Sequence, residues 1–131
     1  MNKLFLLFMA AALIFGGCTP AEQIPDTYRQ ISTQEAVDMM ASETGYIILD
    51  VRRSDEYAAG HIPGAILIPN EAIGSDPIPE LPDKDQLIMV YCRSGNRSKQ
   101  ASDKLVKLGY TNIVEFGGIN TWTGEVVTGN P

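Results

Sequence analysis

Runs rich in apolar residues recur along the chain at residues 46–50, 66–68, 86–91 and 113–116. The longer runs are nearly continuous, which is typical of strands that are covered on both faces. A shorter apolar element is expected at residues 28–31. We therefore predict a sheet made of short, buried strands.

Two segments between these runs have the spacing and the end signals of helices. Ser32 is a good N-cap, and Glu35 completes a capping box with it, so a helix is expected to continue to about Ser42. Residues 97–108 carry an apolar stripe at helical spacing that ends before Gly109. Strands that alternate with helices predict an α/β fold, in which a mostly parallel sheet has helices on both faces.

The N-terminal segment has the features of an export signal. Lys3 precedes an uncharged apolar run at residues 4–15, and Gly16-Gly17-Cys18 follows it directly. A cysteine after small residues resembles the bacterial lipobox, in which the cysteine is acylated and becomes the first mature residue. Cys18 is therefore the predicted lipidation site. An ordinary signal peptide cleaved after Ala21 is the alternative.

These signals divide the chain into three parts. We predict a signal peptide at residues 1–17, a lipid-anchored tether at 18–27 and a single domain at 28–128. The protein is then exported to the cell envelope and anchored to a membrane, facing the periplasm. The alternative signal peptide gives a soluble periplasmic protein.

The charge of the mature chain limits its partners. Without Lys3 it has 9 basic and 16 acidic residues, so its net charge is −7. An acidic chain gains no electrostatic attraction to nucleic acid or anionic lipid, so we expect no nucleic-acid partner and membrane contact only through the lipid anchor. The sequence has no cluster with metal-ligand spacing and no nucleotide-binding loop, so it predicts neither a metal nor a cofactor.

The candidate chemistry lies where the strand at residues 86–91 leads into Cys92-Arg93-Ser94-Gly95-Asn96-Arg97-Ser98 and the second helix. Ligands of α/β sheets bind beyond the carboxyl ends of strands. A thiol there faces loop N–H groups and the positive end of the helix, and Arg93 and Arg97 add positive charge, so a thiolate is favoured. Arg97 and Lys99 oppose the helix dipole, which an anion bound in the loop would explain.

Two other interpretations of Cys92 stay open. One is a buried structural residue beside a solvated basic face, and the other is one half of a disulfide with Cys18. The disulfide would constrain only a flexible tail. The basic surroundings favour a reactive cysteine over both.

The loop at residues 92–98 resembles the active-site loop of the rhodanese family, Cys-Arg-x-Gly-x-Arg followed by Ser or Thr. Asp50-Val51-Arg52 and the stretch from Glu56 to Ala65 are similar to the family's upstream signature. Gly117-Gly118-Ile119 with Trp122 is similar to its C-terminal signature. The three stretches occur in the family's order. The resemblance implies a rhodanese-like, doubly wound α/β domain.

The resemblance also implies a thiosulfate sulfurtransferase in which Cys92 is the catalytic nucleophile. Cys92 would take sulfane sulfur from a small anionic donor and carry it as a persulfide to a thiol or cyanide acceptor. The expected substrate-binding residues are Arg93, Ser94, Gly95, Asn96, Arg97, Ser98 and Arg52. We expect the protein to be a monomer.

Two alternatives share this fold. Phosphatases and arsenate reductases have one residue more between the cysteine and the arginine than the four found here between Cys92 and Arg97. A non-catalytic module that carries or binds sulfur is the other alternative.

Four residues near these motifs are assigned with more caution. Asp50 is expected to have a structural role, and Arg52 either organises the mouth of the site or forms a surface ion pair with it. His61 lies in a turn-forming sequence and is expected to be structural. Trp122 is expected to be a wall or core residue.

Overall fold

The computed structural model describes residues 27–131 of the chain. The proposed signal peptide, Cys18 and the tether up to residue 26 lie outside the described residues. Within them the elements are, in order, β1 (Arg29–Gln30), α2 (Thr33–Ser42), β2 (Ile47–Asp50), α3 (Ser54–Ala59), β3 (Ile66–Leu67), η1 (Asn70–Ala72), β4 (Ile88–Cys92), α4 (Asn96–Lys107), β5 (Ile113–Gly118) and η2 (Ile119–Thr121).

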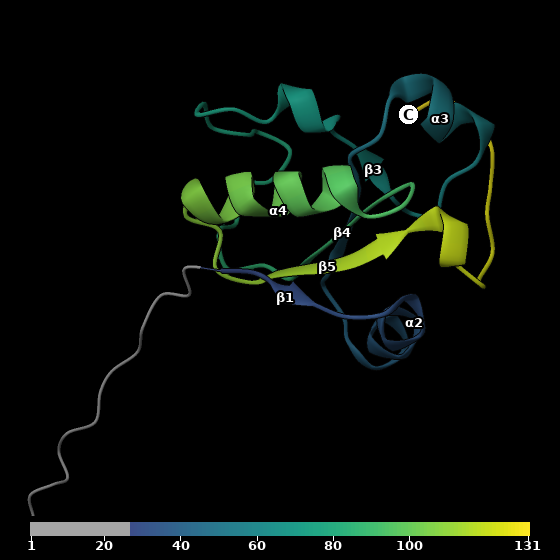
Figure 1. Cartoon of the computed structure of the whole chain (residues 1–131). Coiled ribbons are helices and arrows are strands. Elements are labelled where there is room, and N and C mark those ends of the chain that lie inside the picture. The colour runs from purple at the N-terminus through teal and green to yellow at the C-terminus, as the bar shows by residue number, and fades with distance from the viewer. Residues whose placement is uncertain (1–26) are drawn as a thin grey trace, which may run out of the picture.

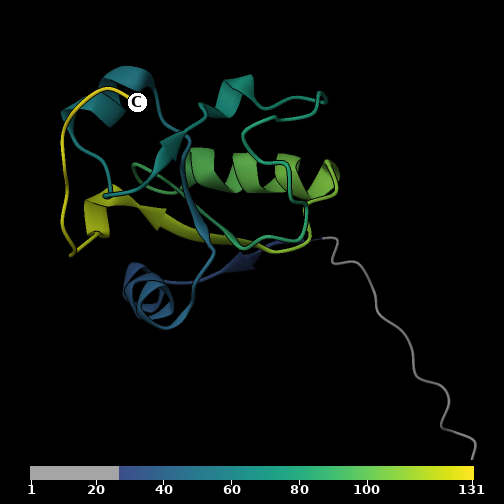
Figure 2. The ribbon, with the colours of Figure 1, turned by 180° about the vertical axis from the view of Figure 1, so that it is seen from behind.

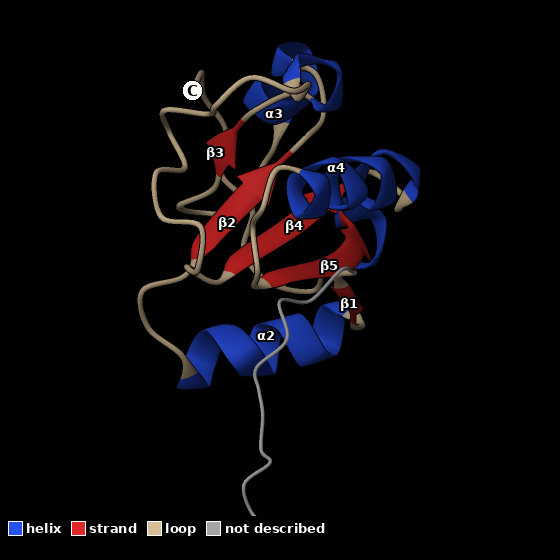
Figure 3. Ribbon diagram, turned by 90° about the vertical axis from the view of Figure 1, so that its left-hand side faces the viewer, coloured by secondary structure: helices blue, strands red, loops and turns tan. Residues whose placement is uncertain are grey.

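All five strands form one parallel sheet, in the order β1-β5-β4-β2-β3. Helix α2 lies on one face of the sheet and α4 on the other (Figure 3). This arrangement confirms the predicted α/β fold with a parallel sheet and helices on both faces. Each expected strand is present, with ends that differ from the expectation by at most two residues.

Strands β2 and β4 contribute side chains alternately to two cores. In β4, Ile88, Val90 and Cys92 pack on the α4 side, whereas Met89 and Tyr91 pack on the α2 side. This alternation follows from the period of two in a strand, and it requires apolar residues at successive positions when both faces are covered. Cys92 therefore faces α4 because it is in phase with Ile88 and Val90.

The helix ends follow the sequence signals in part. At the start of α2 the Ser32 hydroxyl accepts a hydrogen bond from the Glu35 N–H at 3.0 Å, and the Glu35 carboxylate accepts one from the Ser32 N–H at 3.0 Å. The predicted capping box is therefore confirmed. The short helix α3 has no counterpart in the sequence analysis, because its six residues bury only Tyr57 and so have no apolar stripe.

One end of the molecule gathers the segments that carry the motifs. Figures 1 and 2 show α3, η2 and the C-terminal residues together at the end of the sheet toward which the β5 arrow points. The loops that follow β2 and β4 reach the same end, because all strands are parallel. No helix within residues 27–131 is long and apolar enough to cross a membrane.

Candidate active site

Cys92 is the last residue of β4, and only 1% of it is exposed. The chain turns after it, and Gly95 adopts a left-handed φ of 116° as the N-cap of α4. Glycine favours this conformation because a side chain there is strained. The turn directs the Gly95 N–H at the Cys92 Sγ, at 3.0 Å. The start of α4 therefore faces the thiol, as the sequence predicts.

Burial and neutral hydrogen-bond donors act in opposite directions on the pKa of this thiol. Burial is the largest single influence and raises the pKa of Cys92, but hydrogen bonds from the Ser98 side chain and from the backbone of Ser98, Gly95 and Ser94 act against it. The net result is a pKa below the ordinary value for a thiol. The sequence predicts this effect partly from Arg93 and Arg97, whereas backbone N–H groups and a hydroxyl are the principal favourable contributors.

Arg97 has a partner within the chain. Its guanidinium forms a two-pronged ion pair with the Glu56 carboxylate of α3, at 2.7 and 3.0 Å. The hydrogen bond from Arg97 is the largest cause of the fall in the pKa of Glu56, to about 2. The anion that explains a cation in the first turn of α4 is thus a side chain of this protein. Arg97 joins α3 to α4, and its role toward a substrate stays a prediction.

Arg52 and Asp50 form a buried pair at the end of β2. The Arg52 Nη2 lies 2.7 Å from an Asp50 carboxylate oxygen and also donates to the Gly60 carbonyl at 2.7 Å. The Tyr91 hydroxyl donates to the same carboxylate oxygen at 2.7 Å. The alternative of a surface ion pair is wrong, because both partners are buried. The network fixes the mouth of the site around Gly60.

The end of β5 lies unusually close to the Cys92 loop. A Cβ at Gly118 would lie 1.9 Å from the Arg93 carbonyl oxygen and 2.6 Å from the Ser94 nitrogen. The Asn120 N–H donates to the same Arg93 carbonyl at 3.2 Å. Gly118 therefore allows β5 to support the loop from behind, which gives a physical reason for the Gly117-Gly118 motif.

The remaining predicted binding residues of the loop differ in exposure. Arg93, Ser94 and Asn96 are exposed, whereas Gly95 and Ser98 are buried. Arg93 forms no ion pair with another residue in the part of the chain that the structure describes. A pocket of about 300 Å³ opens beside the loop and is lined by Arg52, Glu56, Ala59, Gly60, Arg93, Ile119 and Asn120. The structure thus brings Arg52 and Arg93 to one pocket and leaves Ser98 beneath the thiol.

His61 and Trp122 lie away from the thiol chemistry. His61 is buried, stacks on Tyr57 with ring centroids 3.7 Å apart, and its Nδ1 lies 2.8 Å from the Tyr57 carbonyl. Trp122 packs against Phe116 on the α2 side of the sheet. Both contacts agree with the structural roles expected from the sequence.

Two acidic residues near the loop are not among the site residues that the sequence predicts. Glu56 holds Arg97 although 41 positions separate them, so no local spacing indicates the pair. Glu115 is 2% exposed and lies behind the loop, where its Oε2 accepts a hydrogen bond from the Gly117 N–H at 2.8 Å. Its signal in the sequence is a single acid within an apolar run, and such a residue is rarely buried without a specific partner.

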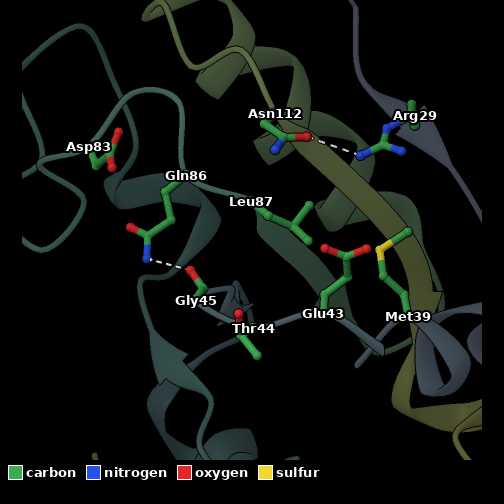
Figure 4. Close-up of a pocket in the computed structure, with 9 residues that line it drawn as sticks. All are labelled: Arg29, Met39, Glu43, Thr44, Gly45, Asp83, Gln86, Leu87 and Asn112. Atoms are coloured by element: carbon green, nitrogen blue, oxygen red, sulfur yellow. Dashed lines mark hydrogen bonds between the residues drawn. The ribbon is translucent and has the colours of Figure 1, made fainter. Parts of the chain in front are cut away.

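A second pocket lies at the opposite end of the sheet. It has a volume of about 390 Å³. Its lining includes the residues just before three strands, namely Gly45 before β2, Leu87 before β4 and Asn112 before β5 (Figure 4). Ligands of parallel sheets bind at the carboxyl ends, so this pocket is not the expected place for catalysis. No group of three or more His, Cys, Asp or Glu residues within residues 27–131 is arranged to hold a metal ion.

The arrangement agrees with a known protein family. Residues 32–125 match the family model of the Rhodanese-like domain. The chain belongs to the rhodanese family. The match includes the Cys92 loop, the Asp50–Arg52 pair and the Gly117-Gly118 motif, so the resemblance found in the sequence is confirmed.

Several relatives support sulfurtransferase activity in general. The thiosulfate sulfurtransferase PspE of Escherichia coli is 37% identical over 71 residues, 54% of this chain and 68% of PspE. The thiosulfate sulfurtransferase GlpE of Pseudomonas entomophila is 34% identical over 108 residues, 79% of this chain and 95% of GlpE. A structure of rhodanese with anions from E. coli is 33% identical, with a TM-score of 0.60 over 64% of this chain and 99% of that one. The chain spans only 27% of the adenylyltransferase and sulfurtransferase UBA4 of Candida albicans.

Proposed function

We propose that this protein is a thiosulfate sulfurtransferase that carries sulfane sulfur on Cys92. The observation that carries the proposal is the position of Cys92, at the carboxyl end of β4 with the Gly95 N–H directed at its Sγ from 3.0 Å. These surroundings lower the pKa of Cys92, and the thiolate is the nucleophilic form of cysteine. The similarity to PspE and GlpE supports thiosulfate as the donor.

The reaction consists of two displacements at sulfur. The Cys92 thiolate attacks the outer sulfur of thiosulfate, so that a new S–S bond forms while the bond to the sulfonate sulfur breaks and sulfite leaves with the electron pair. Cys92 then carries a persulfide whose terminal sulfur is anionic. Cyanide or a thiolate attacks that terminal sulfur, the S–S bond breaks, and its electron pair returns to Sγ. Neither step requires a proton from the substrate.

The loop stabilises the negative charge on the sulfur of Cys92 and attracts the anionic donor. Backbone N–H groups at the start of α4 point toward the position of the sulfur, and fixed donors of this kind stabilise charge without reorganising. Arg93 is the exposed cation that attracts the donor to the pocket, since Arg97 is held by Glu56. Arg52 keeps the pocket in shape through Asp50 and Gly60.

The test is a thiosulfate and cyanide assay that follows thiocyanate. Cys92→Ser should abolish turnover, because a hydroxyl cannot carry the sulfur. Arg93→Ala should raise the KM for thiosulfate about three- to tenfold, the effect of one charge-assisted contact in a solvated site. Arg29→Ala is the matched control, because Arg29 is an exposed arginine on β1 that pairs with Asn112 and does not line the pocket. Aryl phosphate hydrolysis without thiocyanate formation would instead support the phosphatase alternative.

We propose further that the protein acts at the cell envelope, anchored by a lipid on Cys18. The support is the sequence pattern of residues 1–18, an uncharged apolar run followed by Gly-Gly-Cys. Cys18→Ala should abolish metabolic labelling with a fatty acid and release the protein from the membrane fraction. Labelling and fractionation that are unchanged in this variant would contradict the lipid anchor.

A further inference from the structure

Glu115 is a buried acid that the proposed sulfur transfer does not use. It is 2% exposed in β5, and its Oε2 lies 2.5 Å from the Ser98 hydroxyl and 2.8 Å from the Gly117 nitrogen. It forms no ion pair with any residue between 27 and 131. A buried carboxylate without a cation is costly, so its position next to the reactive loop requires a reason.

The Ser98 hydroxyl connects this acid to the nucleophile. Its Oγ lies 3.4 Å from the Cys92 Sγ and 2.5 Å from the Glu115 Oε2, and Ser98 is fully buried. A hydroxyl has one proton and can donate to only one of two anions at a time. If Cys92 and Glu115 were both ionised, one of them would face an oxygen lone pair in a buried site. Like charges in such a setting disfavour double ionisation.

We propose that Cys92 and Glu115 hold one negative charge between them and that Ser98 passes the proton from one to the other. When the thiolate forms, the S–H bond of Cys92 breaks and its proton bonds to Ser98 Oγ. At the same time the original hydroxyl proton of Ser98 bonds to Glu115 Oε2. The net charge of the three residues does not change. In the product Glu115 donates to Ser98, and Ser98 donates to the thiolate.

The other charged groups around Cys92 and Glu115 do not take part in this proton transfer. These groups are Arg93 in the loop, Arg97 on α4 with Glu56 of α3, Arg52 with Asp50 after β2, and Glu71 of η1 near Arg97. Arginine stays protonated at all relevant pH values. Glu56 stays ionised near neutral pH, because its pKa is about 2. Asp50 is held by Arg52.

The inference rests on the proposed role of Cys92 as the nucleophile, and it makes Glu115 a positioning residue that acts through Ser98. Alkylation tests it without any sulfur donor. Iodoacetamide forms an S–C bond at Cys92 and releases iodide, which removes the charge of the thiolate. Glu115 should then ionise and release its proton to the solution. Proton release and thiolate absorbance are measured together in weakly buffered solution near pH 7, in the Cys18→Ala background, where Cys92 is the only cysteine.

The expected result is thiolate absorbance before alkylation together with release of one proton for each Cys92 alkylated. Glu115→Gln should keep the thiolate, because its amide can donate to Ser98, but proton release should fall toward zero. Glu43→Gln, a change at an exposed acid at the C-terminal end of α2, should behave like the parent protein. Thiolate absorbance without proton release in the parent protein, or equal release from Glu115→Gln, would overturn the proposal.

A second measurement does not depend on the folding of the variant. An infrared difference spectrum of the parent protein should show the loss of a protonated carboxyl band and the gain of a carboxylate band on alkylation. A spectrum without a carboxyl change contradicts the relay. If thiosulfate left no sulfur on Cys92 while both alkylation results held, the proposed function would fail and the shared charge would stand.

Discussion

Replacement of Arg97 by alanine should destabilise the protein in a manner that depends on pH. Arg97 binds both carboxylate oxygens of Glu56 and thereby connects α4 to α3. The side chain of Glu56 is 14% exposed and that of Arg97 is 28% exposed, so solvent screens the pair only in part. Removing the guanidinium leaves a largely buried carboxylate without its main partner.

The magnitude follows from the pKa of Glu56, which falls from 4.5 to about 2 in the folded protein. At about 1.36 kcal/mol for each pKa unit, this fall corresponds to about 3 kcal/mol of stability at pH 7. Part of it comes from the Arg53 N–H and from the Arg53 guanidinium, 3.7 Å from Glu56, which the substitution retains. We therefore expect Arg97→Ala to lower the free energy of unfolding by about 2 kcal/mol.

The sign of the pH dependence follows from the direction of the shift. A lowered pKa means that the contribution is fully present above the unfolded value of 4.5 and is lost as the pH falls through about 2. The difference in the free energy of unfolding between the parent protein and Arg97→Ala should therefore shrink from about 2 kcal/mol at pH 7 to about 1.2 kcal/mol when urea unfolding is measured at about pH 3.

Lys107→Ala is the matched control for this measurement. Lys107 is also on α4 and pairs with Asp103 at 3.0 Å, but both side chains are more than half exposed. Lys107→Ala should lower the free energy of unfolding by less than about 1 kcal/mol. The assignment of this ion pair as a structural link would be refuted if Arg97→Ala lowered the free energy of unfolding no more than Lys107→Ala does. It would also be refuted if the effect of Arg97→Ala were the same at both pH values.

Two further substitutions test the supports of the site. Gly118→Ala places a Cβ 1.9 Å from the Arg93 carbonyl oxygen, so it should displace the loop, lower the melting temperature and reduce thiocyanate formation. Gly74→Ala has open space and should have none of these effects. Tyr91→Phe removes a hydroxyl that donates to Asp50 at 2.7 Å and accepts from a backbone N–H, so it should cost about 1–3 kcal/mol in urea unfolding. Normal stability of either Gly118→Ala or Tyr91→Phe would contradict the corresponding contact.

Much of the fold could be predicted because its signals are local. Continuous apolar runs mark the strands, since a sheet covered on both faces requires apolar residues at successive positions. The Ser32–Glu35 capping box marks the start of α2. Helix α3 was missed because it has six residues and buries one of them, so no period could develop.

The site was predicted less completely, because its contacts join distant parts of the chain. Cys92 follows from its position after a strand, and its electropositive loop is visible in the sequence. The partner of Arg97 is 41 positions away, and Glu115 lies on the neighbouring strand, where pairing register decides which residues meet. The spacing of these residues in the sequence does not predict that they are in contact. The sequence thus indicates the nucleophile but not the side chains that control its loop.

The most direct test of sulfur transfer is the mass of the protein after exposure to thiosulfate without an acceptor. The account predicts that the peptide containing Cys92 gains one sulfur atom and that the gain is absent in Cys92→Ser. Addition of cyanide should remove the added sulfur and produce an equal amount of thiocyanate. An unchanged mass of the Cys92 peptide, in folded protein whose thiol still reacts with iodoacetamide, would contradict the central claim.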